Sequence, residues 1–197
     1  MRFWTSDQHF YHKSINSLCN RPFESLDEMH YQIIERWNSV IGAEDIVYCL
    51  GDFHWSPSHL KEIMDLLNGR KLLCAGNHDK CHSCHKKHEK QKYHYLQAGF
   101  EQVEESFFTS LYGYRIKMSH FPYWDPKATE GGYSLRYQQW RPEKDAEHVL
   151  LHGHRHSKPE ESVRLDGEKL TIDVGVDAWN FTPLSENDIM NIIEENL

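Results

Sequence analysis

The chain has 197 residues, a formal net charge of −8 and 15 histidines. This length is typical of one domain with a substantial core, and we expect a single domain over residues 1–197. Lys and Arg do not gather into a stripe, which argues against a stable nucleic-acid partner. No stretch approaches the roughly 18 consecutive apolar residues of a membrane span, and the chain starts with a strand-like run. We therefore expect a soluble cytoplasmic protein with no membrane partner.

Three strand-like runs alternate with two amphipathic helices in the first 75 residues. The strands are expected at 1–6, 45–50 and 71–75. The first helix follows a capping box that runs from Ser25 to Glu28, and the second begins near Pro57 and ends at Gly69. Strands joined in this way by helices predict a parallel sheet with right-handed crossovers.

The second half of the chain is richer in strands. Further strands are expected at 114–118, 149–151, 162–165 and 170–174. Asp166-Gly167 predicts a hairpin turn between the last two of these strands. A C-terminal helix is expected from Ser185, a suitable cap, to Asn196.

The five cysteines are an odd number, which argues against a disulfide framework and for reducing conditions. Cys49 and Cys74 lie inside expected strands, where each is explained as a small buried hydrophobic residue.

Clusters that contain residues of metal-ligand type follow five of the strand-like runs. The clusters are Asp7-Gln8-His9, Gly51-Asp52, Gly76-Asn77-His78-Asp79, Ser119-His120 and Gly153-His154-Arg155-His156. Ligands collect where the strands of an open α/β sheet end, so these clusters are expected to converge. Residues two apart in an extended segment point to the same side, as Asp7 and His9 would, and His154 and His156 repeat that spacing. Asp52 is the natural bridge between two ions about 3.5–4 Å apart, and the pattern indicates a two-metal phosphoesterase.

In order, the motifs D-x-H, G-D, G-N-H-D, a single His and G-H-x-H resemble the calcineurin-like metallophosphoesterase superfamily over essentially the whole chain. Other runs resemble its compact prokaryotic and viral branch, namely Arg21-Pro22-Phe23, Trp37-Asn38, 47–53 and 174–180. The resemblance implies an α/β fold in which two mixed β-sheets pack as a central sandwich flanked by helices, without a cap domain.

The resemblance also implies two divalent metal ions. One would be held by Asp7, His9, Asp52 and His156, and the other by Asp52, Asn77, His120 and His154. Carboxylate, imidazole and amide ligands without a thiolate suit Mn first, with Fe, Zn, Ni or Co as alternatives. A hydroxide between the ions would attack phosphorus in line, with Asp52 and His78 as the catalytic residues. His78 would protonate the leaving oxygen or stabilise the transition state, and Asp79 would orient its neighbours.

Residue type alone does not assign a role to the Arg and His residues around this ligand set, because most Arg and His residues lie on the surface or in a hydrogen-bonded core. Arg21, His12 and His54 are the candidate substrate contacts. The chain also departs from many relatives three positions after the bridging aspartate, where Trp55 replaces an acidic residue or a histidine.

Two segments beside the expected site remain open. Cys81, Cys84, His85 and His88 could hold zinc, but they lack the second half of a usual zinc knuckle, and a solvated loop or helix start is favoured. The stretch around Gly131-Gly132 predicts a loop.

The sequence thus predicts an enzyme that hydrolyses phosphate monoesters or diesters, with small or cyclic nucleotides as candidate substrates. The alternatives are a metal-dependent nuclease acting on nucleic-acid ends and a non-catalytic, metal-stabilised binding protein. The natural substrate and the oligomeric state are left open.

Overall fold

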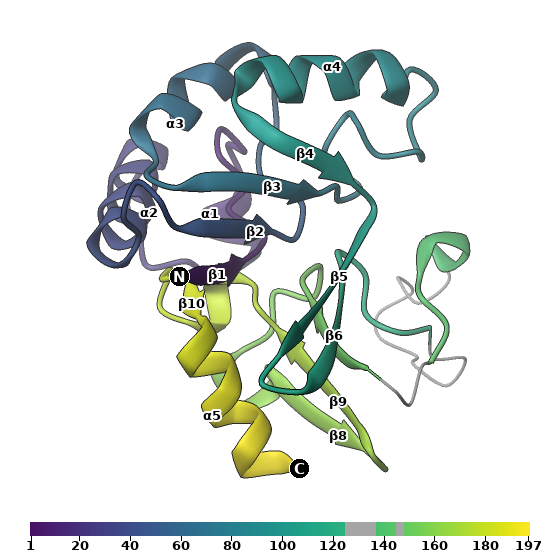
Figure 1. Cartoon of the computed structure of the whole chain (residues 1–197). Coiled ribbons are helices and arrows are strands. Elements are labelled where there is room, and N and C mark those ends of the chain that lie inside the picture. The colour runs from purple at the N-terminus through teal and green to yellow at the C-terminus, as the bar shows by residue number, and fades with distance from the viewer. Residues whose placement is uncertain (125–136, 145–147) are drawn as a thin grey trace.

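The computed structural model describes residues 1–124, 137–144 and 148–197, and contains two five-stranded sheets within those residues. Figure 1 shows the sheets one above the other, with most of the helices over the outer face of the first sheet. The loop predicted around Gly131-Gly132 lies outside the described residues.

The first sheet has the strand order β10-β1-β2-β3-β4. Its strands are β1 (Arg2–Thr5), β2 (Ile46–Cys49), β3 (Arg70–Cys74), β4 (Phe100–Glu104) and β10 (Leu184–Ser185). The four strands β1 to β4 are parallel, as the sequence predicted for β1, β2 and β3, and β10 pairs antiparallel with β1. The carboxyl ends of β1, β2 and β3 therefore lie at one edge of this sheet.

The second sheet has the order β5-β6-β7-β9-β8. Its strands are β5 (Ser106–Leu111), β6 (Tyr114–Ser119), β7 (Val149–His152), β8 (Val163–Asp166) and β9 (Lys169–Asp173). The pairs β6–β7 and β7–β9 are parallel and the outer pairs are antiparallel, so both sheets are mixed.

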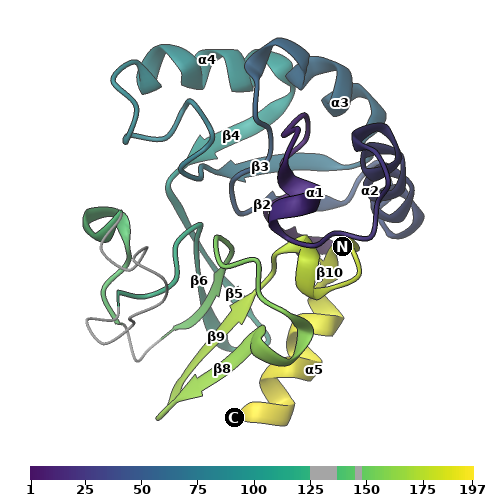
Figure 2. The same ribbon diagram turned by 180° about the vertical axis from the view of Figure 1, so that it is seen from behind.

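The helices divide between the two sheets. They are α1 (Ile15–Leu18), α2 (Leu26–Val40), α3 (Leu60–Leu66), α4 (His88–Ala98) and α5 (Glu186–Asn196). Figures 1 and 2 both draw α2, α3 and α4 beside the first sheet and α5 running from β10 alongside the second. This is the flanked two-sheet sandwich expected from the resemblance.

Strands of the first sheet are buried on both faces, because alternate side chains enter different cores. Phe3 and Val47 pack with the helices in one core, whereas Trp4 and Leu50 pack with the second sheet and α5 in the other. A strand in this position is hydrophobic almost without interruption, which explains the strength of its signal in the sequence.

Both predicted helix caps are present. The Ser25 hydroxyl accepts a hydrogen bond from the Glu28 amide, although the Glu28 carboxylate accepts from Glu24 and does not close the box. Ser185 and Asp188 form a complete capping box at the start of α5. The predicted hairpin is also present, with Gly167 and the residue after it forming the turn.

The sequence did not predict α1, α4, β4, β5 or β10. Helix α4 buries only Tyr95 and Ala98, so its apolar periodicity is faint. Strand β10 has two residues, too few for an alternating pattern. These elements exist because neighbouring strands and the first sheet provide a surface for them.

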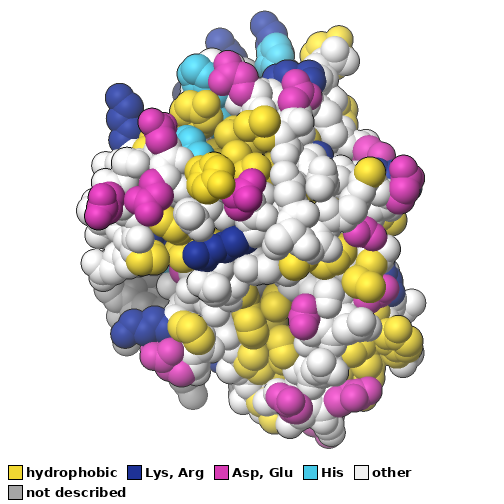
Figure 3. All heavy atoms as spheres, turned by 90° about the vertical axis from the view of Figure 1, so that its left-hand side faces the viewer, with side chains coloured by type: hydrophobic (Ala, Val, Ile, Leu, Met, Phe, Trp, Pro, Cys, Tyr) yellow, Lys and Arg dark blue, Asp and Glu magenta, His cyan; other side chains and the backbone are white. Residues whose placement is uncertain are grey.

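The surface agrees with the dispersed charge of the sequence. On the face drawn in Figure 3, Lys and Arg side chains are interspersed with acidic and uncharged groups and form no continuous stripe, although several lie near the top of the view. Among the described residues, no helix is long and apolar enough to cross a bilayer.

Candidate metal centre

One group of predicted ligands brings together Asp7, His9 and His156, whose ligand atoms all lie within 4.8 Å of one another. Asp7 Oδ1 is 3.9 Å from His9 Nε2 and 4.0 Å from His156 Nε2. Asp7 and His9 follow β1, whereas His156 follows β7, so the group joins the ends of strands from both sheets.

A second group contains Asp52, His120 and His154, with ligand atoms again within 4.8 Å of one another. Asn77 joins this group, since its Oδ1 atom is 3.2 Å from His120 Nε2. The His120 Nδ1–H donates to the Leu50 carbonyl over 2.8 Å, which leaves the Nε2 lone pair directed at the group.

The Asp52 carboxylate connects the two groups. Its Oδ2 atom is 3.6 Å from His9 Nε2 in the first group, and its Oδ1 atom is 3.5 Å from His120 Nε2 in the second. The structure thus brings together all seven residues predicted as ligands, in the two sets that the resemblance implied. Their roles as ligands remain a prediction.

Most of these residues have left-handed backbone conformations that are unusual for residues other than glycine. The φ angles are 61° at Asp7, 53° at His9, 50° at Asp52, 73° at His154 and 49° at His156. Such angles cost free energy and persist where the surrounding structure imposes them, often at functional sites. Asp7 and His9 do converge, but through this local conformation and not through the extended segment that the sequence predicted.

Hydrogen bonds between loops impose the conformation. The Asp7 amide donates to the Gly51 carbonyl and the His9 amide to the Asp52 carbonyl, each over 3.0 Å. These bonds continue the parallel pairing of β1 with β2 into the loops that follow, and hold the first two clusters side by side.

Asp79 fixes the loops that follow β2 and β3. Its carboxylate accepts hydrogen bonds from the amides of Asp52, Phe53 and Gly76, at 2.8, 3.2 and 2.9 Å. Asp79 is fully buried, and the geometry is that of the orienting role suggested by the sequence.

A carboxylate that the sequence did not predict, that of Asp177, holds the His156 ring from behind. The His156 Nδ1–H donates to Asp177 Oδ2 over 2.8 Å, and Arg21 binds both oxygens of the same carboxylate, at 2.8 and 2.9 Å. Arg21 also donates to the carbonyls of Asp7 and Gln8. The Arg21 guanidinium is buried and directed at these acceptors, so the geometry does not support the substrate contact expected for it. The run 174–180, noted for its resemblance, was the signal that contained Asp177.

Burial is the main influence on the pKa values of the site. It raises the pKa of Asp7 to about 6 and the pKa of Asp52 to about 7. It also lowers the pKa of His9 and His154 well below the usual range, because neighbouring cationic groups add to the penalty. Burial alone would lower the pKa of His156 too, but its hydrogen bonds with Asp177 and Cys19 raise it well above the usual value.

His78 stands at the open side of the centre. Its backbone amide donates to Asp52 Oδ1 over 2.9 Å, its Nε2 atom is 3.8 Å from Asp52 Oδ2, and its side chain is 37% exposed. Burial and the neighbouring imidazoles lower the pKa of His78 to about 4. The His78 ring is therefore neutral near pH 7 and has one N–H group to donate.

The two remaining candidate contacts differ. His12 lies at the rim, with its ring centroid 5.5 Å from that of His9 and 6.4 Å from that of His78. His54 is only 1% exposed and lies within the core, where its Nδ1 atom accepts from the Ser56 amide. Contact between His54 and a substrate is not supported by this position.

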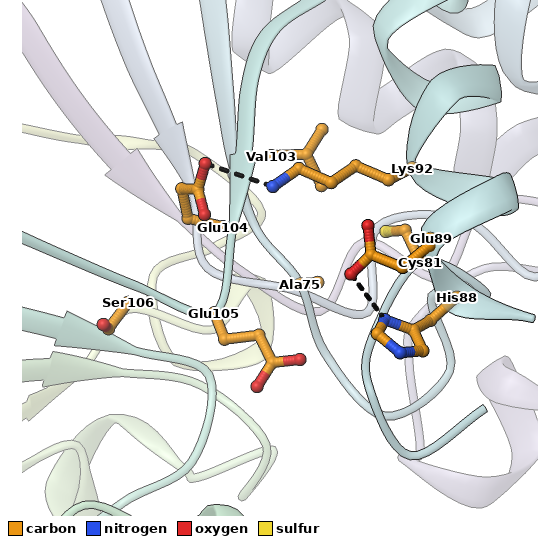
Figure 4. A pocket seen from close by; sticks show the side chains of 9 residues that line it. All are labelled: Ala75, Cys81, His88, Glu89, Lys92, Val103, Glu104, Glu105 and Ser106. Carbon is orange, nitrogen blue, oxygen red and sulfur yellow. Dashed lines mark hydrogen bonds and ion pairs between the residues drawn. The ribbon is translucent and has the colours of Figure 1, made fainter. Parts of the chain in front are cut away.

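The segment from Cys81 to His88 does not gather into a metal site. Among the described residues, its Cys and His side chains form no group of three ligand atoms. The His85 Nε2–H donates to the Asn77 carbonyl over 2.9 Å, and Cys84 Sγ lies 3.7 Å from the same oxygen. Cys81 and His88 instead line a separate cavity of about 330 Å³. Figure 4 shows Lys92 paired with Glu104 and the His88 ring beside the Glu89 carboxylate.

The ligand set fits divalent metal ions. Asp7 Oδ1 and His9 Nε2 are buried and have no hydrogen-bond partner among the described residues. Buried polar atoms of this kind are costly unless a partner satisfies them, and both atoms point into the first group. Oxygen and nitrogen ligands without a thiolate match a Mn, Fe or Zn site.

Comparison with known proteins shows the family of this chain. Residues 5–181 match the model of the calcineurin-like phosphoesterase superfamily domain. The uncharacterized protein MJ1445 of Methanocaldococcus jannaschii is 30% identical over 194 residues, covering 96% of this chain and 89% of its own. The gene 66 protein of Mycobacterium phage D29 is 31% identical and covers 99% of this chain and 98% of its own. The crystal structure of AQ665 from Aquifex aeolicus, a protein of unknown function, superposes with a TM-score of 0.71 at 27% identity, over 98% of both chains. The chain belongs to the calcineurin-like phosphoesterase superfamily, a superfamily of metal-dependent phosphoesterases, as its five motifs predicted.

Proposed function

We propose that this protein uses two divalent metal ions to hydrolyse a small phosphate monoester or diester. The observation that carries the proposal is the position of Asp52, whose two carboxylate oxygens face two separate groups of candidate ligands. A carboxylate that bridges two ions is typical of two-metal hydrolases. Mn is our first expectation for both ions.

The residues that would hold one ion are Asp7, His9, Asp52 and His156, and the other would be held by Asp52, Asn77, His120 and His154. Ions held in this way supply an activated water molecule as nucleophile and neutralise charge on the phosphoryl oxygens. The protein supplies the geometry: Asp79 holds the loops after β2 and β3, and Asp177 holds the ring of His156.

His78 would act directly on the substrate. It is exposed beside Asp52, so it can reach an oxygen of a phosphate group bound at the centre. Its neutral ring can donate a hydrogen bond to the leaving oxygen, and a bound phosphate anion would favour the protonated ring that transfers a proton.

The test uses p-nitrophenyl phosphate and bis-p-nitrophenyl phosphate as a monoester and a diester. Metal-stripped protein reloaded with Mn should hydrolyse at least one of them, and the Asp52→Asn variant should be inactive although folded. The ratio of the two rates distinguishes a phosphatase from a phosphodiesterase. Absence of turnover with Mn, Fe, Zn, Ni or Co in a folded, metal-loaded protein would contradict the proposal.

A further inference from the structure

A second cavity, of about 340 Å³, lies beside His78. Its lining includes Tyr11, His12, Lys13, Trp55 and His59. It contains none of the seven predicted ligands. Its volume falls at the lower end of the range of about 300–1,000 Å³ for ligand pockets, which suits one small molecule or substituent.

A set of ring contacts connects this cavity to the centre. The Trp55 ring lies 4.9 Å from the His78 ring at an interplanar angle of 36°, and 4.0 Å from the His12 ring at 65°. The His12 ring in turn makes an edge contact with His9, at 5.5 Å. A group bound against Trp55 would therefore contact the same ring that contacts His78, the residue proposed to face the reacting phosphate.

Trp55 is 42% exposed, although its neighbours His12 and His78 hold the ring in place. A single exposed aromatic residue is common on protein surfaces and means little alone. Here the ring lines a cavity and also contacts His78 beside the metal centre.

One cation, Lys13, stands at the cavity, and the Glu62 carboxylate is held on its far side by Tyr11 and His59. Lys13 is exposed at the edge of the cavity, and no described residue forms an ion pair with the Lys13 ammonium group. In a chain of net charge −8, such a cation attracts an anionic ligand to this side of the centre. The imidazoles of His12 and His59 add hydrogen-bonding groups around the Trp55 ring.

We propose that this cavity binds a planar aromatic or heteroaromatic substituent of the phosphate ester, such as the base of a nucleotide, by stacking on Trp55. The inference rests on the proposed function, because it takes the phosphate to lie at the metal centre. Stacking on an aromatic ring contributes binding free energy for every base and needs no specific hydrogen bonds. Trp55 would thus select the class of ester without selecting one base.

Binding can be measured separately from turnover. We would titrate the Mn-loaded protein calorimetrically with the four common nucleoside 5′-monophosphates and with ribose 5-phosphate, which lacks only the base. We expect the wild-type protein to bind at least one nucleotide about tenfold or more tightly than the sugar phosphate. Trp55→Ala should remove this difference and leave the affinity for ribose 5-phosphate within about twofold.

Two further variants serve as controls. Trp55→Phe keeps a ring and should retain most of the preference, whereas Tyr93→Ala removes an aromatic side chain that is 60% exposed on α4 and should change nothing. The Mn content and melting temperature of Trp55→Ala, compared with wild type, show whether the metal centre is intact.

The inference fails if the wild type binds nucleotides and ribose 5-phosphate equally, or if Trp55→Ala weakens both by the same factor. The second result would mean that Trp55 only shapes the loop after β2. Failure of the proposed function has a different signature, since base-dependent binding would then persist while no phosphate ester was hydrolysed with any metal.

Discussion

Arg21 and Asp177 are 156 residues apart in the chain and form an ion pair with two hydrogen bonds, Nε to Oδ1 at 2.8 Å and Nη2 to Oδ2 at 2.9 Å. The pair is buried, and the carboxylate also accepts a hydrogen bond from His156. Arg21 additionally binds the carbonyls of Asp7 and Gln8. Arg21 therefore connects the loop after β1 with Asp177 in the segment after β9, and Asp177 in turn contacts His156 in the loop after β7.

Replacing Asp177 tests this connection. In the Asp177→Asn variant we expect Mn affinity to fall by about 10- to 100-fold, as is usual when the carboxylate behind a histidine ligand is lost. Stability should fall by about 3–5 kcal/mol, because the buried Arg21 charge loses its partner. Titration of the metal-stripped protein with Mn and thermal unfolding would measure these effects.

Glu101→Gln is the matched control, since it breaks a pair with Arg70 that also has two hydrogen bonds but lies on the surface. This change should leave Mn affinity unaltered and stability nearly so. Equal Mn affinity in Asp177→Asn and wild type would mean that Asp177 does not position His156.

Gly76→Ala should disrupt the second group. A Cβ atom on Gly76 would meet Asp52 Oδ1 and lie 2.5 Å from the Asp52 amide and 2.9 Å from His120 Nδ1. Since neither loop can move away freely, we expect stability to fall by about 1–3 kcal/mol and Mn to be bound with lower stoichiometry. Gly42→Ala is the control, because its nearest neighbour would be 3.4 Å away at Asp45. Metal content and unfolding would be measured for both, and a normal metal content in Gly76→Ala would contradict the expectation.

His78→Ala should separate catalysis from metal binding. Loss of a group that donates a proton or hydrogen bond lowers kcat by about 10²- to 10⁴-fold, while metal content should stay near two ions per chain. His94→Ala changes a histidine on α4, a different element from the loop that contains His78, and should leave kcat and metal content unaltered. Turnover of p-nitrophenyl esters and elemental analysis would be compared. If kcat were unchanged, His78 would have no part in the reaction.

The stabilisation by Mn should increase with pH. In the metal-free protein burial raises the pKa of Asp7 to about 6 and of Asp52 to about 7, above the ordinary value of 3.8. The contribution of these two carboxyls to the free energy of unfolding is therefore fully present below about pH 4, and it is lost as the pH rises through 6 to 7. A divalent ion must displace the same protons, so its apparent affinity rises over that window.

The measurement is the increase in melting temperature caused by 1 mM Mn, taken from pH 5.5 to pH 8. We expect a larger increase at pH 8 than at pH 5.5, and a weaker dependence on pH in Asp52→Asn, which lacks one of the two carboxyls. An increase that did not vary with pH would mean that protons and Mn do not compete at these groups.

The sequence alone predicted the superfamily, the candidate ligands and the parallel core of this protein. The ligand types are local features, because each follows a buried strand whose apolar side chains are visible in the sequence. Strands β1, β2 and β3 enter two cores at once, so their hydrophobic runs mark them clearly, and the loops that follow must meet at one edge of the sheet. This relationship made Asp7, Asp52 and Asn77 predictable as neighbours.

Only the tertiary structure decided what surrounds those ligands. Arg21 and Asp177 meet across 156 residues, and no local pattern indicates that a buried arginine will bind a carboxylate and not a substrate. The left-handed φ angles at Asp7 and His9 arise from hydrogen bonds to a different loop, so an extended segment was the wrong expectation. The place of Trp55 beside His78 likewise depends on how the loops after β2 and β3 pack together. Strand signals reside in the order of neighbouring residues, whereas these contacts are fixed by the packing of segments far apart in the chain.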